Sequence, residues 1–366
     1  MSTKNRPGEV RDAVAAYLAT VSAGAAIGNI TTAVIAQLER DVPASSVRSI
    51  LNLGGDLFVR VGRGRYAARV SMDPVWKQDS VELHQADCLA WLHSREPNSI
   101  HGVVTDPPYG VVEYTPKEVA KLRSGKGGVW RLPPAFDGHQ RAPLPRFTTL
   151  SEKDVFDLGV FFYDWATALL PVVVPGGHVL VACNPLLSYR IATAIADAGW
   201  ERRGEIVRLV QTMRGGDRPK GAHEEYADVS VMPRSQWEPW LLFRKPLEGT
   251  VRQTLQIWGT GGLRRISDER PFGDVIASHP TRPAEKKIAN HPSLKPQHFL
   301  RQVVRAILPL GSGVVLDPFA GSGSTIAAAL AVGYDAIGVE RDAEYVALAR
   351  KSIQKLAAYD PPGPAV

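Results

Sequence analysis

Residues 313–324 read GVVLDPFAGSGS, and this stretch decides the fold. Its first half is a short apolar run typical of a buried parallel strand. An aspartate, a proline and a glycine-rich loop follow, and the alanine-rich residues 325–332 then predict a helix. A strand, a glycine loop and a helix in this order let a cofactor approach the backbone closely, although a glycine loop alone is compatible with many nucleotides.

The next strand is predicted at residues 334–340 (YDAIGVE), and it ends in an acid. Glu340 follows Gly321 by 19 residues, which is about the spacing at which an acidic side chain can hold ribose hydroxyls. Two strands and an intervening helix therefore predict half of a doubly wound α/β domain.

A second motif follows another apolar run, residues 100–105 (IHGVVT), which runs directly into DPPYG at 106–110. Two successive prolines cannot continue a central strand or a helix interior, so the chain must turn out at the carboxyl edge of the sheet. Open α/β sheets bind their ligands at that edge. Taken alone, Asp-Pro-Pro is equally consistent with a simple loop breaker.

Together, the two motifs resemble the amino-methyltransferase family of DNA modification enzymes. The catalytic motif of that family is Asp/Asn/Ser-Pro-Pro-Tyr, and its cofactor loop is Asp-Pro-Phe-x-Gly-x-Gly. Here the catalytic motif comes first, the circularly permuted order of the β class. The resemblance covers most of residues 80–357 and implies a Rossmann-like α/β fold, a seven-stranded sheet with one strand reversed. It also implies S-adenosylmethionine as the cofactor.

The resemblance assigns roles residue by residue. Catalysis falls to Asp106, Pro107, Pro108 and Tyr109: the Asp106 side chain and the Pro107 carbonyl accept hydrogen bonds from the exocyclic amine, and Tyr109 stacks on the base. Cofactor binding falls to Asp317, Pro318, Phe319, Ala320, Gly321, Gly323, Ser324 and Glu340, to Asp87 and Cys88 in QADCL, and to His291, Ser293 and Lys295 in NHPSLKP. Asp317 and Lys295 are expected at the methionine end, and Glu340 and Asp87 at the ribose and adenine.

Two of these residues have a structural alternative. Phe319 could be a core residue, and Asp87 could be the N-cap of a helix over residues 88–92. No metal is expected, because a sulfonium is already a good leaving group and the nine histidines form no obvious cluster.

Residues 1–70 predict a small separate module, a winged helix-turn-helix. Helical spacing at 10–18 and 30–38 is followed by a third helix, which Ser45 or Ser46 can cap, and by a hairpin over 57–67 with a glycine turn. Residues 71–79 are expected to be a linker to the methyltransferase domain at 80–357.

Charge favours DNA as the partner of this module. Residues 1–70 carry nine Lys and Arg and five Asp and Glu, a net +4 of the chain's +6. We expect Ser45, Ser46 and Arg48 in a major groove and Arg63 and Arg65 on phosphates. The alternative is a protein-docking module with solvated arginines.

Two insertions, residues 111–150 and 249–282, are candidates for target recognition. Both are rich in loop-forming residues, and the second contains WGTGGLRR, whose Arg264 and Arg265 are expected to contact DNA.

The favoured function is transfer of a methyl group to N6 of adenine in double-stranded DNA after base flipping, since Asp opens the catalytic motif. The alternative within the same chemistry is N4 of cytosine. RNA or protein glutamine is less favoured, because such enzymes carry Asn-Pro-Pro-Tyr after the cofactor loop. A different class, a DNA-binding regulator with an inactive methyltransferase fold, conflicts with the intact motifs.

Composition points to a cytoplasmic protein. There is no apolar signal segment, the longest apolar run, around residues 169–183, is interrupted by Pro and Gly, and the two cysteines form no metal or disulfide pattern. The family resemblance leaves room for a homodimer and a cognate restriction enzyme, without a sequence signal for either.

Removing residues 1–70 tests the DNA-binding module. We expect weaker DNA binding and a shallower dependence of log K on log salt concentration, because fewer phosphates are neutralised, while methyl transfer persists. Fluorescence anisotropy at several salt concentrations measures this. An unchanged salt slope would contradict the prediction.

Overall fold

The computed structural model describes residues 8–108, 135–136, 139–140, 151–210, 218–219, 221–233, 235–291 and 293–362. Tyr109 and nearly all of the insertion at 111–150 lie outside the described residues. They are not discussed structurally.

A nine-stranded sheet organises the large domain, in the order β12-β10-β11-β9-β6-β13-β14-β5-β4. The strands are β4 (Trp76–Gln78), β5 (Val81–Gln85), β6 (Ile100–Thr105), β9 (Val173–Ala182), β10 (Glu201–Leu209), β11 (Trp237–Arg244), β12 (Val275–Ala277), β13 (Val314–Asp317) and β14 (Asp335–Glu340). The inner seven, β10 to β5, contain one reversed strand, β11, antiparallel to both neighbours. The prediction of a Rossmann-like seven-stranded sheet is confirmed. Short strands β12 and β4 extend its two edges.

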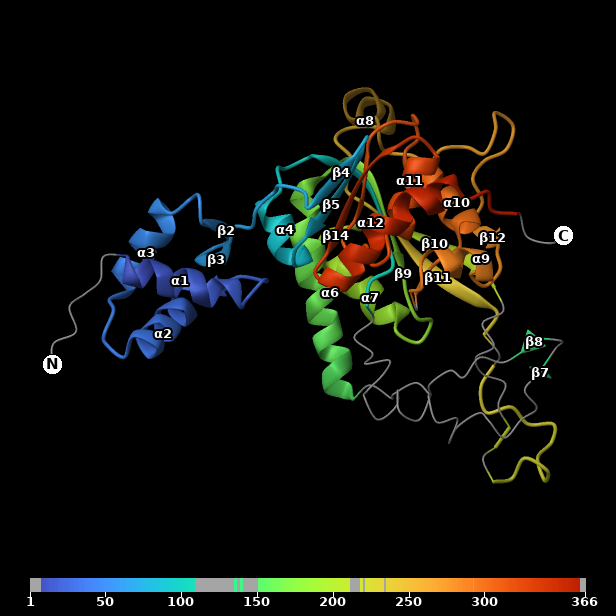
Figure 1. Ribbon diagram of the computed structural model, residues 1–366, viewed down its shortest axis with the longest axis horizontal. Coiled ribbons are helices and arrows are strands. Elements are labelled where there is room, and N and C mark those ends of the chain that lie inside the picture. The colour runs from blue at the N-terminus through green and yellow to red at the C-terminus, as the bar shows by residue number, and fades with distance from the viewer. Residues whose placement is uncertain are drawn as a thin grey trace.

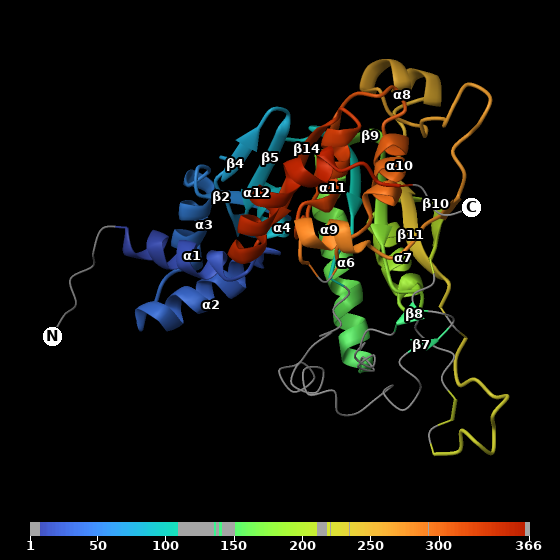
Figure 2. The same ribbon diagram turned by 45° about the vertical axis from the view of Figure 1, so that its right-hand side comes forward.

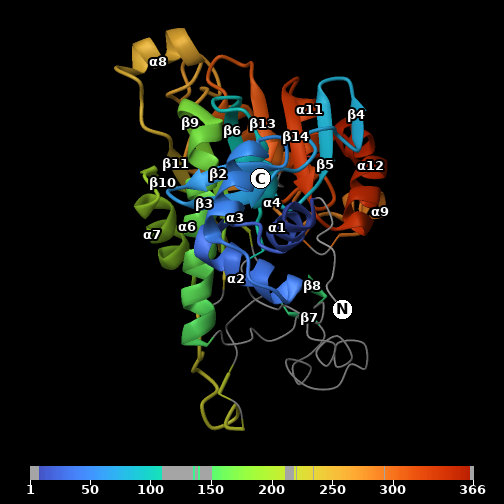
Figure 3. The same ribbon diagram turned by 90° about the vertical axis from the view of Figure 1, so that its left-hand side faces the viewer.

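Helices cover both faces of the sheet (Figures 1 and 3). One cluster of buried side chains packs α10 (Gln297–Ile307), α11 (Ser324–Ala331) and α12 (Ala343–Ala358) on one face. The other packs α4 (Cys88–Ser94), α6 (Glu152–Val172) and α7 (Ser188–Asp197) on the opposite face. Two short helices, α8 (Val251–Trp258) and α9 (Pro283–Ile288), lie outside these layers, and β7 (Ala135–Phe136) and β8 (His139–Gln140) form a separate ribbon.

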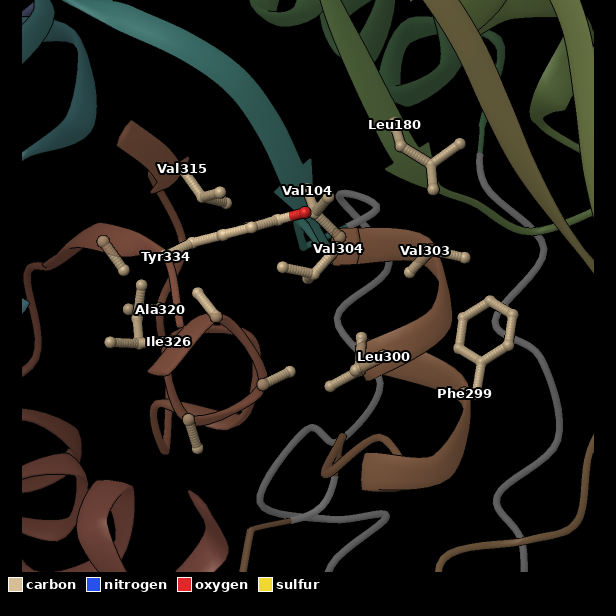
Figure 4. Packing of buried hydrophobic residues seen from close by; sticks show 14 of the residues in the cluster. Val104, Leu180, Phe299, Leu300, Val303, Val304, Val315, Ala320, Ile326 and Tyr334 are labelled. Atoms are coloured by element: carbon tan, nitrogen blue, oxygen red, sulfur yellow. The ribbon is translucent and has the colours of Figure 1, made fainter. Parts of the chain in front are cut away.

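The packing of α10 shows how the first face is filled. Val303 and Val304 point toward Val104 and Leu180 of the sheet (Figure 4). Leu300 is fully buried in the same cluster. Helix α10 therefore packs on β6 and β9 on one face of the sheet.

Pro171 and Pro175 lie inside regular elements, and the expected linker contains a strand. Helix α6 continues past Leu170 and includes Pro171, with Ser151 capping its other end through a capping box. Proline is tolerated in the last turn because the chain leaves the helix immediately afterwards. Residues 175–177 lie inside β9 as an irregularity in its pairing with β6, not as a turn before it. The expected linker at 71–79 contains β4, which pairs with β5.

The N-terminal unit has α1 (Glu9–Ala19), β1 (Ala25–Ala26), α2 (Ile27–Leu38), α3 (Ala44–Leu53), β2 (Phe58–Gly62) and β3 (Arg65–Ala68). Its three strands form a sheet in the order β1-β3-β2 around a separate apolar core. The N-cap of α3 is Pro43, which makes no side-chain cap, so neither Ser45 nor Ser46 caps the helix.

This unit lies beside α4 of the large domain (Figure 2). The backbone N–H of Val70 donates to Ser94 Oγ at 3.1 Å, and Ala23, Val70 and Met72 pack against the α4–α6 core. The two units therefore share a packed contact.

Helix α6 is long and apolar enough to cross a membrane by length and composition. Phe162, Trp165 and Leu169 are fully buried in the core, as in the central helix of a globular domain. The hydropathy of α6 is therefore weak evidence for a span.

Leu300→Ala should lower the free energy of unfolding by about 2–5 kcal/mol, because it leaves a cavity beneath α10. The matched control is Leu310→Ala, at a leucine that is 61% exposed, which should change stability by less than about 0.5 kcal/mol. Urea unfolding measures both. Equal effects would contradict the packing described here.

Candidate functional site

The two sequence motifs meet because β6 and β13 are parallel neighbours, with Gly102 opposite Val315. At their carboxyl ends, Thr105 Oγ1 donates a buried hydrogen bond to Asp317 Oδ1 at 2.7 Å. The backbone N–H of Phe319 donates to the same oxygen at 3.1 Å. The sheet thus joins the catalytic motif and the glycine loop across 212 residues of sequence.

A pocket lies where the loops meet. Its walls are Asp106, His291, Ser293, Lys295, Asp317, Phe319, Ala320, Gly321, Ser322, Ser324 and Thr325. It combines one residue of the catalytic motif with the cofactor loop and the segment at 291–295. Pro107 is buried and Pro108 exposed beside it.

The glycine loop needs its glycines. Gly321 and Gly323 have φ of +50° and +79°, in the left-handed region that side chains disfavour. A Cβ on Gly323 would lie 2.5 Å from Ile353 Cγ1, and one on Gly321 would lie 3.2 Å from His291 Nε2. The backbone N–H of Gly321 donates to Glu340 Oε2 at 2.9 Å, so the acid at the end of β14 is tied to the loop.

Asp106 is held by a lysine. Lys295 Nζ lies 2.9 Å from Asp106 Oδ2 and 2.8 Å from Glu238 Oε1. The resemblance placed Lys295 at the cofactor, and the structure adds that its ammonium bridges two carboxylates. Burial alone would lower the pKa of Lys295, but Asp106 and Glu238 outweigh burial and raise it.

Glu238 and Arg208 were not predicted. Glu238 begins the reversed strand β11, so it lies at the same edge as the ends of the parallel strands. It accepts a 2.7 Å contact from Arg208 Nη1. A charged residue at the start of a reversed strand was the signal available in the sequence.

Asp317 has an unusual environment for a carboxyl group. Burial, with Asp106 nearby, raises its pKa to about 6, against hydrogen bonds from Thr105, Thr325 and Phe319 that lower it. It therefore titrates close to neutral pH.

The remaining predicted cofactor residues lie around the loop. Phe319 is half-buried and contacts Phe161 and Trp165 at centroid distances of 6.1 Å, so it packs on the core while also lining the pocket. The His291 ring packs edge-on against Tyr345 at 4.5 Å. Pro318 lies in the turn directly after β13.

Asp87 is the N-cap of α4, accepting from the backbone of Leu89 and Ala90, as the structural alternative predicted. The backbone N–H of Ala86 donates to the Glu340 carbonyl at 3.1 Å, which brings Asp87 to the same edge as Glu340. Cys88 is buried, and burial raises the pKa of its thiol. Neither Asp87 nor Cys88 is among the residues lining the pocket.

The predicted DNA-contacting residues divide into groups. Ser45, Ser46, Arg48 and Arg63 are exposed on α3 and the hairpin. Arg65 is also exposed, but it donates to the Gly24 carbonyl at 2.9 Å and lies close enough to His93 and Asp164 to influence their pKa. It faces the contact with the large domain.

DNA contact by Arg264 and Arg265 stays a prediction, and the structure places Arg264 away from Asp106. Arg264 Nη1 donates to the hydroxyl of Tyr334 at 2.8 Å, just before β14 begins. Arg264 therefore lies near the amino ends of the parallel strands, the edge opposite Asp106, and Arg265 is the next residue along the chain. Loop composition could not reveal that residues 249–265 pack against the far edge. Ser278 and His279, after β12, reach Arg208 at the catalytic edge instead.

Comparison with known proteins identifies the family. The family model described as DNA methylase, of the N6/N4 class, matches residues 100–351, about two thirds of the chain. The chain belongs to this family. It is an S-adenosylmethionine-dependent DNA methyltransferase of the N6/N4 amino class.

Two relatives and two solved structures are similar to this chain over most of its length. Type II methyltransferase M2.DpnII of Streptococcus pneumoniae is 21% identical over 290 residues, covering 79% of this chain and 96% of the relative. M.HindIII of Haemophilus influenzae is 21% identical over 284 residues, covering 71% and 91%. The solved structure of the M1.HpyAVI–SAM complex is similar, with 17% identity and a TM-score of 0.47, covering 75% of this chain and 98% of that one. The structure of PvuII cytosine-N4-specific DNA methyltransferase is similar at 16% identity and a TM-score of 0.49, covering 77% of this chain and 92% of that one.

The pocket fits the cofactor. The missing side chain at Gly321 keeps the space between the loop and His291 open, since a Cβ would narrow it to 3.2 Å. The Asp317 carboxylate suits a ligand that carries an ammonium group. Within the described part of the chain, no group of three or more His, Cys, Asp and Glu could hold a metal ion.

The affinity for S-adenosylmethionine should rise between pH 5 and 7, with a midpoint near 6. The cationic cofactor binds the ionised Asp317 carboxylate better, so affinity should increase by up to about tenfold per pH unit below the midpoint. Calorimetry on the wild type and Asp317→Asn measures this. The variant should bind weakly and without this pH dependence, and a flat wild-type profile would contradict the assignment.

Proposed function

We propose that this enzyme methylates N6 of adenine in double-stranded DNA, with Asp106 as the residue that binds the target amine. The observation that carries the proposal is the shared pocket of Asp106, Asp317 and Gly321. The choice of adenine rests on the Asp that opens the Asp-Pro-Pro-Tyr motif, a feature of the family resemblance.

The target amine is a poor nucleophile because its lone pair is delocalised into the ring. A hydrogen bond from its N–H to the Asp106 carboxylate, and a second to the Pro107 carbonyl, draw the nitrogen toward tetrahedral geometry and free the lone pair. The rigid proline pair and Lys295 keep these acceptors fixed in advance, so little reorganisation is needed.

Bound S-adenosylmethionine supplies a methyl group on a positively charged sulfur. The chain's own residues do the rest: Asp317, Gly321 and Glu340 hold the cofactor, and Asp106 stabilises the positive charge that develops on the amine nitrogen. Placing the two reactants in one pocket makes the transfer effectively unimolecular.

A base inside a duplex cannot reach this pocket, so the target adenine must be flipped out, at a cost of a few kcal/mol. We propose that Tyr109 stacks on the flipped base. The exposed face of α3, with Ser45, Ser46 and Arg48, and Arg63 on the hairpin bind the flanking duplex. We expect the enzyme to work in the cytoplasm, where chromosomal DNA lies.

Asp106→Ala should reduce methyl transfer at least about 1,000-fold while leaving cofactor affinity within about threefold, because Asp106 acts on the amine. Tritium transfer to DNA and calorimetry with the cofactor measure the two properties. Near wild-type activity in the variant would contradict the catalytic assignment.

Mass spectrometry of nucleosides from DNA treated with isotopically labelled S-adenosylmethionine tests the target base. Label in N6-methyladenine is the expected result. Label in N4-methylcytosine would keep the mechanism and overturn the choice of base. No label in DNA, with cofactor bound, would favour the regulator hypothesis or another acceptor.

A further inference from the structure

Four charged side chains of alternating sign form a chain that ends at the catalytic carboxylate. Arg208 Nη1 lies 2.7 Å from Glu238 Oε2, Glu238 Oε1 lies 2.8 Å from Lys295 Nζ, and Lys295 Nζ lies 2.9 Å from Asp106 Oδ2. Their side chains are only 7% to 17% exposed. With two positive and two negative charges, this group of four side chains is neutral overall.

Arg208, the charged side chain of this group farthest from Asp106, is held by several contacts. Arg208 Nε donates to Ser278 Oγ at 3.0 Å, and Nη2 donates to the His279 carbonyl at 2.8 Å. Its guanidinium also lies 5.4 Å from the centre of the Phe299 ring. Because β12 pairs in parallel with β10, the strand fixes Ser278 and His279 beside Arg208.

Glu238 forms ion pairs with both Arg208 and Lys295. Burial alone would raise the pKa of Glu238, but Lys295 and Arg208 lower it to about 2, so the carboxylate is ionised throughout the working range. A buried carboxylate between two cations costs desolvation energy that an apolar core would avoid. Such a network therefore calls for a functional explanation, and one of its members is Asp106.

We propose that Glu238 and Arg208 are positioning residues for methyl transfer, which hold Lys295 so that Asp106 is oriented toward the target amine. This inference rests on the proposed function of Asp106. With Glu238 in place, Lys295 is shared between two carboxylates and binds one oxygen of Asp106. Without the Glu238 charge, the ammonium is no longer held between two carboxylates, so Asp106 loses the fixed orientation in which it meets the amine.

The same hairpin offers a matched control. Arg208 and Glu238 are cross-strand partners near one end of β10 and β11, and Glu201 and Arg244 are partners at the other end. Arg244 Nη2 lies 2.6 Å from Glu201 Oε2, and the Arg244 side chain is 9% exposed. The second pair lies at the opposite edge of the sheet from Asp106 and makes no contact with Lys295.

Glu238→Gln and Glu201→Gln are compared in the full-length enzyme with DNA and S-adenosylmethionine. Loss of an orienting partner behind a reacting group typically costs about 10- to 100-fold, so kcat should fall by that factor in Glu238→Gln. Its KM for both substrates should stay within about threefold. Glu201→Gln should keep wild-type kcat, and Glu238→Asp, which restores the charge, should recover part of the loss.

The pH profile separates positioning from stability. Lys295 faces Asp106 from β6, Glu238 from β11, Arg208 from β10 and His291 from its own segment. Removing the Glu238 charge lowers the pKa of Lys295, so the alkaline limb of kcat should move to lower pH in Glu238→Gln and not in Glu201→Gln.

Melting temperatures identify loss through unfolding, and Arg208→Lys gives a second variant should Glu238→Gln fail to fold. Equal kcat and pH profiles in the two Gln variants, both folded, would overturn the inference while leaving the proposed function intact. Failure of the wild type to methylate DNA would overturn the proposed function itself.

Discussion

The structure depends on one adjacency, the parallel pairing of β6 with β13, fixed at its carboxyl end by the hydrogen bond from Thr105 to Asp317. Each strand alone delivers half of a site: β6 ends in the catalytic motif, and β13 ends in the glycine loop. Because parallel strands present their ends at one edge, pairing them puts Asp106 and Asp317 on the same pocket although the chain separates them widely. For the same reason, the permuted order of the two motifs in the sequence does not change the arrangement of the pocket.

The reversed strand β11 adds what the parallel strands cannot. A parallel strand brings its last residues to the catalytic edge, whereas β11 brings its first, and Glu238 is among them. That places an acid where it can meet Lys295, and the antiparallel register with β10 supplies Arg208 as its partner. The acidic partner of Lys295 is therefore at the catalytic edge because β11 runs in the reverse direction.

Much of the fold was readable from local pattern. The strands β14, β13 and β6 and the helix after the glycine loop follow from apolar runs and glycine loops, and the single reversed strand follows from the family resemblance. The end of α6 is not visible in the sequence, because Pro171 lies inside its last turn, where a proline resembles a helix stop. The bridging role of Lys295 and the Glu238–Arg208 pair could not be predicted, since they depend on contacts between residues 30 to 189 positions apart in the sequence. The position of Arg264 could not be predicted for a related reason: loop composition does not indicate which edge of the sheet a loop covers.

The central claim is that a single pocket holds both the cofactor and the acceptor amine. A crystal structure of the enzyme with S-adenosylhomocysteine, the demethylated cofactor, tests it most directly. The account predicts the ligand against the glycine loop, with its homocysteine end beside Asp317 and its sulfur facing Asp106. A ligand bound elsewhere, or one whose sulfur is turned away from Asp106, would contradict it.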